Sequence, residues 1–230
     1  MRAQSVTIDR PLRRRLTLAV ATAMVALLPV GCAYEGLTLP AITAMTLQGD
    51  GALTRPTPEA ASRPNTGGLA YTYNPALAPE GARFRVVMKP SGESTTAELT
   101  VSGLLPNRGY SVVADNNACS PNPAAEGPHY QNRVDPGVNP TAVGVASSTN
   151  PEYANPRNEV WLDVRTDGSG SGTSRTTVPF VFTDRGPGSV VIHEAEQTAT
   201  EAGKAGNGGA PIACLSLSPV RPGQNPRGSE

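Results

Sequence analysis

The sequence predicts an all-β fold, and three observations support this prediction. Short runs rich in β-branched and aromatic residues recur from about residue 69 onward. The chain contains 24 glycines and 23 prolines, which divide these runs with turn signals. Between residues 67 and 220, no run of apolar residues repeats with the period of an amphipathic helix. Many short strands separated by turns are typical of a β-sandwich or a β-barrel.

About eight strands are expected, each short and bounded by turn residues. The run Thr95–Leu104 alternates apolar and polar positions, as a strand with one buried face does. The runs 158–166 and 174–182 flank the sequence DGSGSG, which is a hairpin signal. The expected strands are 69–74, 83–89, 95–104, 109–115, 158–166, 174–182, 189–194 and 211–218.

Two long segments, 116–157 and 195–210, lack a strand pattern. A loop of such length inside a compact domain is usually either functional or disordered. The first loop contains Cys119 and His129, and the second lies between His193 and Cys214. These four residues are therefore the first candidates for a functional site whose loop is held in place by a disulfide.

The N-terminal region has the pattern of an export signal. Four arginines (Arg10, Arg13, Arg14 and Arg15) precede the apolar run LTLAVATAMVALLPV, which ends at Gly31 and Cys32. The run is short for a membrane span. The sequence thus predicts a signal peptide over 1–32, a flexible Pro/Thr/Ser-rich tether over 33–66, one β-domain over 67–220 and a disordered tail over 221–230.

Cys32 allows two interpretations. The sequence LLPVGC is similar to a bacterial lipoprotein box, in which the cysteine is lipidated and becomes the mature N-terminus; Pro29 departs from that pattern. Cleavage after Ala33 by an ordinary signal peptidase fits the same residues. The first interpretation, which we favour, predicts a lipid-anchored envelope protein, and the second predicts a secreted one.

The charge balance argues against nucleic acid as a partner. The chain has 19 basic and 19 acidic residues and a formal net charge of zero. Proteins that bind nucleic acid through bulk charge are usually strongly basic on one face. A protein partner of unknown kind is compatible with this composition.

Three cysteines are an odd number for an exported protein. If Cys32 is lipidated or removed, Cys119 and Cys214 remain as a pair in an oxidising compartment, where a disulfide persists. Two buried free thiols are the alternative.

Five motifs in order resemble the copper/zinc superoxide dismutases of the bacterial exported branch. They are SGL at the end of a strand, a cysteine before GPH, the strand SVVIHE, a glycine-rich loop, and IAC before the last strand. The resemblance implies an eight-stranded Greek-key β-barrel with two long loops. It implies that Cys119 and Cys214 form a disulfide. It also implies that His129 matches the histidine that bridges copper and zinc, and that His193 matches a further copper ligand.

Several positions depart from that family. Ser111 and Val113 stand where the family has two copper-binding histidines, and Asn155 stands near the position of the zinc aspartate. No histidine lies between His129 and Val160, and Pro211 replaces the arginine that guides superoxide. Because Cu(II) prefers four ligands and zinc three or four from the protein, we expect zinc to be absent and dismutase activity to be absent or low.

Three hypotheses follow from this partial match. The first is a catalytically degenerate envelope protein with a structural or binding role. The second is a copper-binding protein that uses His129 and His193, helped by Asp115 or Glu194. The third is an enzyme that still dismutates superoxide with substitute ligands. The distance between the two imidazole rings is the structural observation that helps to distinguish them.

Overall fold

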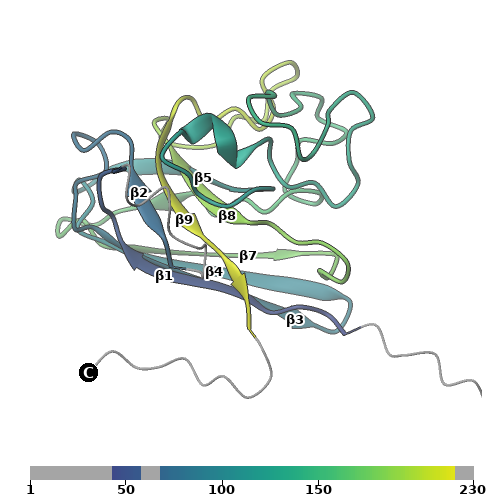
Figure 1. Ribbon diagram of the computed structural model, residues 1–230, viewed down its shortest axis with the longest axis horizontal. Helices are drawn as coiled ribbons and strands as arrows, with labels where there is room; N and C mark the ends of the chain where they lie inside the picture. The colour runs from purple at the N-terminus through teal and green to yellow at the C-terminus, as the bar shows by residue number, and fades with distance from the viewer. Residues whose placement is uncertain (1–42, 58–67, 221–230) are drawn as a thin grey trace, which may run out of the picture. The chain divides into compact units, whose positions relative to one another are not determined.

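The computed structural model describes residues 43–57 and 68–220, which form two five-stranded antiparallel sheets (Figure 1). The first sheet has the order β10-β1-β3-β4-β7, and the second has the order β2-β9-β8-β5-β6. The first comprises β1 (Leu47–Ala52), β3 (Arg83–Ser91), β4 (Ser94–Ser102), β7 (Gly172–Val178) and β10 (Ser218–Pro219). The second comprises β2 (Ala70–Thr72), β5 (Gly109–Asp115), β6 (Val164–Arg165), β8 (Ser189–His193) and β9 (Pro211–Ser216). One 3-10 turn, η1 (Pro123–Glu126), lies in the first long loop.

The predicted all-β class is confirmed, whereas of the expected eight-stranded barrel or sandwich the closed barrel is wrong. The eight predicted strands correspond to β2 through β9, and β1 and β10 join them. Among the described residues, the hydrogen-bonded order of the first sheet ends at β10 and β7, and that of the second ends at β2 and β6. The sheets therefore face each other as separate layers, and they do not close into one barrel.

Strand β1 lies inside the range that was predicted to be a tether. It pairs with β3 over six residues, from Leu47 opposite Met88 to Ala52 opposite Arg83. The tether prediction over 33–66 is therefore wrong for residues 47–52. Sequence reasoning missed the strand because Gly49 and Gly51 look like turn residues. A Cβ at Gly49 would lie 2.5 Å from the Ser216 carbonyl oxygen, and one at Gly51 would lie 2.4 Å from the Gly68 carbonyl oxygen. The glycines thus allow close packing against neighbouring backbone.

The first sheet buries one face and leaves the other in solvent. Along β4 the burial alternates, so that Ala97, Leu99 and Val101 are buried while Glu98 and Thr100 are exposed. This alternation is what the period of a strand produces when one face packs on a core. The buried side chains of both sheets form one apolar cluster between the layers.

The second sheet is buried on both faces. All seven residues of β5 and all five of β8 are buried. Val112 and Ile192 belong to the core between the sheets. Ser111 and His193 are register partners in these two strands, and their side chains lie on the opposite face. In Figure 1 the teal and yellow loops lie beyond β5 and β8, on the side away from the first sheet.

The sequence DGSGSG connects the two sheets and does not close a hairpin. β6, before it, pairs with β5, whereas β7, after it, pairs with β4. Asp167 organises the turn, since its Oδ1 accepts hydrogen bonds from the amides of Ser169 and Ser171. The turn prediction is thus right and the hairpin pairing is wrong.

Several predictions fall outside the described residues: the signal peptide over 1–32 with Cys32, the tether residues 33–42 and 58–66, and the tail over 221–230. Within the part of the chain that the structure describes, no helix has the length and hydropathy needed to cross a membrane.

Candidate functional site

The two histidines lie next to each other on the outer face of the second sheet. His193 is the last residue of β8, and His129 forms an isolated antiparallel bridge with Asp115 at the end of β5. Their ring centroids are 6.0 Å apart, and the rings meet edge to face at 69°. Each histidine is only 7% exposed. The fold thus brings His129 of a long loop next to His193 of a strand, as the order of the motifs predicted.

A buried carboxylate holds His129. Its Nδ1 lies 3.1 Å from Oε2 of Glu159, which is fully buried. The same oxygen accepts a hydrogen bond from Trp161 Nε1 at 2.7 Å, and Oε1 accepts one from Gln131 Nε2 at 2.8 Å. Because a carboxylate only accepts, Nδ1 of His129 carries the proton of the neutral ring, and the lone pair is on Nε2.

His193 has the opposite environment. Its Nδ1 is buried without a hydrogen-bond partner. Burial and the neighbouring charge of His129 lower the pKa of His193 to about 3. Burial also lowers the pKa of His129, but its hydrogen bond to Glu159 and the charges of Glu159 and Asp115 outweigh this and raise the pKa above the ordinary value. Near neutral pH, His193 is therefore neutral, the form in which imidazole binds metals.

The second long loop packs tightly on the histidines through glycines. A Cβ at Gly208 would lie 2.3 Å from Ser111 Oγ and 2.8 Å from the Cβ of His193. A Cβ at Gly206 would lie 3.4 Å from His129 Nδ1. The glycine-rich composition of residues 203–209 thus lets the loop backbone approach the two rings.

The positions that depart from the dismutase pattern have other roles. Ser111 Oγ hydrogen-bonds Thr198 Oγ1 at 2.7 Å, and Thr198 donates to Asp163. Val113 forms an isolated bridge with Trp161. The amide of Asn155 donates within its own loop to the carbonyl oxygens of Pro151 and Glu152. Pro211 begins β9 opposite His193.

Asp115 and Glu194, the carboxylates expected to assist copper, differ sharply in environment. Glu194 is exposed. Asp115 is buried, and its Oδ1 has no hydrogen-bond partner. Burial raises the pKa of Asp115 to about 7; the charge of His129 lowers it and that of Glu159 raises it.

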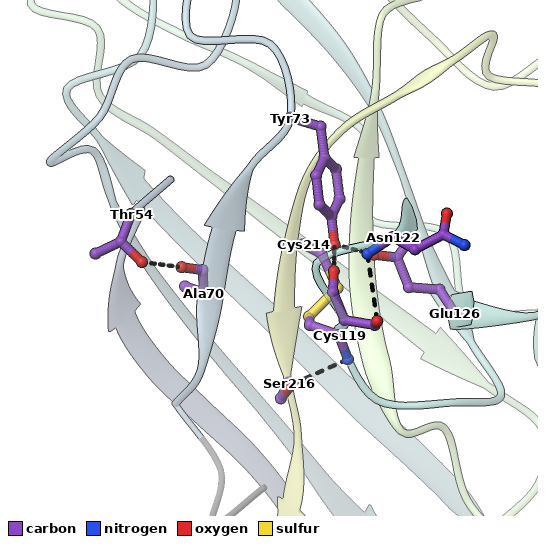
Figure 2. The surroundings of a disulfide bond; sticks show 9 residues. Thr54, Ala70, Tyr73, Cys119, Asn122, Glu126, Cys214 and Ser216 are labelled. Carbon is purple, nitrogen blue, oxygen red and sulfur yellow. Dashed lines mark hydrogen bonds between the residues drawn. A yellow bond between two sulfur atoms is a disulfide. The ribbon is translucent and has the colours of Figure 1, made fainter. Parts of the chain in front are cut away.

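Cys119 and Cys214 form a disulfide across 95 residues, with Cα atoms 5.8 Å apart. It ties the first long loop to β9 (Figure 2). The amide of Cys119 also donates to Ser216 Oγ at 3.1 Å. The pairing expected from the cysteine count and the motif order is therefore present.

A second polar cluster stands beside the disulfide. Figure 2 shows the hydroxyl of Tyr73 pointing toward the disulfide and Glu126, with which it forms a short hydrogen bond. The Tyr73 hydroxyl also lies 2.6 Å from the Ser120 carbonyl oxygen. A hydroxyl has one proton to donate, so a protonated Glu126 can donate to Tyr73 while Tyr73 donates to Ser120. Burial raises the pKa of Glu126 to about 9; Tyr73 lowers it and the charge of Asp115 raises it further.

Cys119, Glu126 and Cys214 also form a close group of potential metal ligands, and it is the one such group of three among the described residues. The disulfide occupies both sulfur atoms, so this group lacks the thiolates that a metal would need. It therefore serves to pin the loop.

Sequence reasoning missed Glu159, although its signal was present. In NEVWLDV, Val160 and Leu162 are fully buried in the core. Strand alternation therefore places Glu159, Trp161 and Asp163 together on the other side. Trp161, two residues from Glu159, donates a hydrogen bond to it.

No protein-family model matches the chain, and no curated protein matches it at a significant level.

Proposed function

We propose that the chain is a copper-binding envelope protein, related to copper/zinc superoxide dismutases, in which His129 and His193 hold one Cu(I). The observation that carries this proposal is the buried Nδ1 of His193, which has no hydrogen-bond partner and belongs to a ring 6.0 Å from that of His129. A buried polar atom without a partner costs about 1–3 kcal/mol. Binding a metal would remove that cost.

The two histidines suit Cu(I) by their number and chemistry. Cu(I) accepts fewer ligands than Cu(II), and imidazole is a suitable donor. Glu159 fixes the proton of His129 on Nδ1, which leaves Nε2 available. Copper bound by both rings would supply one-electron redox chemistry, and the surrounding loops would limit its contact with water.

Kinship with the dismutases is supported by three features together. The chain has two antiparallel sheets, a disulfide that ties a long loop to β9, and two histidines that match copper positions and lie side by side. The proposal of low or absent dismutase activity is supported by Ser111, whose hydroxyl is engaged with Thr198, and by Val113, which offers no donor atom.

The proposed location at the envelope rests on the sequence alone. The apolar run before Cys32 predicts export, and lipidation of Cys32 would attach the protein to a membrane. A bound protein partner is compatible with this location. A purely structural role for the domain is the competing proposal.

The test is a Cu(I) titration of the full chain in competition with bicinchoninate. We expect saturable binding of one Cu(I), lost in His129→Ala and in His193→Ala. Glu159→Gln should weaken binding about 10- to 100-fold, because the partner that orients His129 loses its charge. Thr198→Val is the control: it alters a buried hydrogen bond nearby but keeps both histidines.

Two results would contradict the proposal: no competition with bicinchoninate, or equal Cu(I) binding by the wild type and both alanine variants. Either one would favour the structural role. Binding should also weaken as the pH falls through the pKa of His129, because His129 is the first of the two rings to take up a proton.

A further inference from the structure

A surface hollow of mixed polar and apolar lining lies between β6 and the start of the second long loop, and the copper proposal does not use it. It has a volume of about 460 Å³ and is lined by, among others, Trp161, Asp163, Arg165, Glu196, Gln197 and Thr200. This volume is within the range of small-molecule sites, about 300–1,000 Å³.

Trp161 is held in position by contacts on the side away from the hollow. Its indole N–H is bound to buried Glu159, and its backbone forms a bridge with Val113 of β5. The ring remains partly exposed and lines the hollow. Since its polar edge is already satisfied inside the protein, the indole offers its apolar surface to a ligand.

Both carboxylate oxygens of Asp163 in the lining already accept hydrogen bonds from the protein. Its Oδ1 accepts hydrogen bonds from Val112 N at 3.0 Å and Thr198 Oγ1 at 2.7 Å. Its Oδ2 accepts one from Thr198 N at 2.7 Å. A carboxylate used in this way holds the loop against the sheet and is poorly suited to bind a cation.

The rim offers both donors and acceptors. Arg165 and Glu196 form an ion pair at 3.2 Å, and their side chains are 68% and 61% exposed. Gln197 and Thr200 are exposed beside them. With Asp163 and Glu196 against Arg165, the lining has one more negative than positive charge, which disfavours an anionic ligand.

We propose that this hollow binds a neutral sugar ring of an oligosaccharide. A pyranose combines an apolar C–H surface, which fits the fixed indole, with hydroxyl groups that both donate and accept hydrogen bonds. The Arg165–Glu196 pair and the neighbouring amide and hydroxyl supply the complementary groups. Neither histidine lines this hollow, although Trp161 shares Glu159 as a partner with His129, and the site goes beyond the proposed copper binding.

The chain contains a single tryptophan, so its tryptophan fluorescence reports on this hollow and on Glu159, to which the indole is hydrogen-bonded. The full chain is titrated with the neutral tetrasaccharides cellotetraose, maltotetraose and chitotetraose, and with a sulfated oligosaccharide as the anionic comparison. We expect a saturable change in emission with at least one neutral tetrasaccharide and a weaker response to the sulfated one.

Variants locate the binding site. Measured by calorimetry, Trp161→Ala should weaken binding about tenfold or more, and Arg165→Ala about threefold to tenfold. The matched control is Arg175→Ala, which removes an equally exposed arginine (68%) from an ion pair with Glu98 in the first sheet. It should change affinity less than about twofold.

Three results would overturn the proposal: no saturable response to any neutral tetrasaccharide, tighter binding of the sulfated one, or equal effects of Arg165→Ala and Arg175→Ala. His193→Ala should bind the tetrasaccharide like the wild type, which separates this site from the copper proposal.

Discussion

The two sheets face their surroundings in different ways. Along β3 in the first sheet, Phe84, Val86 and Met88 are buried, whereas Arg83 and Arg85 are exposed. In the second sheet, β5 and β8 have no exposed residue. The first sheet therefore behaves as a simple two-sided layer, with one face in the core and one in water.

The second sheet has a polar outer face that water does not reach freely. Ser111, Asp115, Ser189 and His193 lie in β5 and β8 and are all buried. Each such group needs a partner, because an unpaired buried polar group costs free energy. Ser111 has one in Thr198, whereas Asp115 Oδ1, Ser189 Oγ and His193 Nδ1 have none. The buried polar groups of the candidate site therefore lie under the loops that cover the second sheet, whereas no buried polar side-chain atom of β3 or β4 in the first sheet lacks a hydrogen-bond partner.

Removing the disulfide should have the largest effect, because it ties a covering loop to the second sheet. The double variant Cys119→Ala/Cys214→Ala should lower the free energy of unfolding by about 4–5 kcal/mol, the chain-entropy value for a loop of this length. Urea denaturation measures this loss, and Cys32→Ala serves as the control. A loss below about 1 kcal/mol would show that the other contacts hold the loop.

A pair of variants on β4 tests whether the outer face of the first sheet is open to solvent. Leu99 is 1% exposed, and its neighbour Thr100 points to the solvent face. Leu99→Ala should cost about 2–5 kcal/mol because it opens a cavity in the core. Thr100→Ala should change the free energy of unfolding by less than about 0.5 kcal/mol. Similar losses from both variants, measured by urea denaturation, would mean that the outer face of this sheet is also covered.

The strands of the first sheet were not equally predictable from the sequence. Strands β3 and β4 are recognised from alternation, because one face meets water and the other meets the core. Strand β1 was missed because Gly49 and Gly51 contact backbone of other segments, and such contacts leave no local pattern. The prediction of a closed barrel was wrong for a related reason. Local periodicity identifies strands but does not predict which distant edge strands pair with each other.

Some residues of the candidate site were located from the sequence, and one was missed. The motifs located His129, His193 and the Cys119–Cys214 pair, because residue type and order carry that information. Glu159 was missed, although it is two residues from Trp161, which puts both side chains on one face of the strand predicted over 158–166. That Glu159 contacts His129, 30 residues earlier, depends on how the long loop folds back onto the sheet.

The smallest expected effect is a pH dependence that comes from Glu126 under the first loop. Its pKa in the folded protein is raised to about 9 from an ordinary value of 4.5, first because of burial. The folded state thus keeps a proton that the unfolded state has lost, and stability falls as the pH rises from 4.5 through about 9. Between about pH 7 and pH 9 the fall should be at most about 1.4 kcal/mol per pH unit.

Glu126→Gln isolates this contribution, because glutamine keeps the hydrogen-bonding capacity and does not titrate. Urea midpoints of the wild type and the variant, measured at several values between pH 7 and pH 9, should move further apart as the pH rises, with the variant the more stable protein. His129 titrates in both proteins, so its effect cancels in the difference. Parallel midpoints across this range would mean that Glu126 is already ionised in the folded protein, and that Tyr73 donates its proton to a carboxylate beside the disulfide.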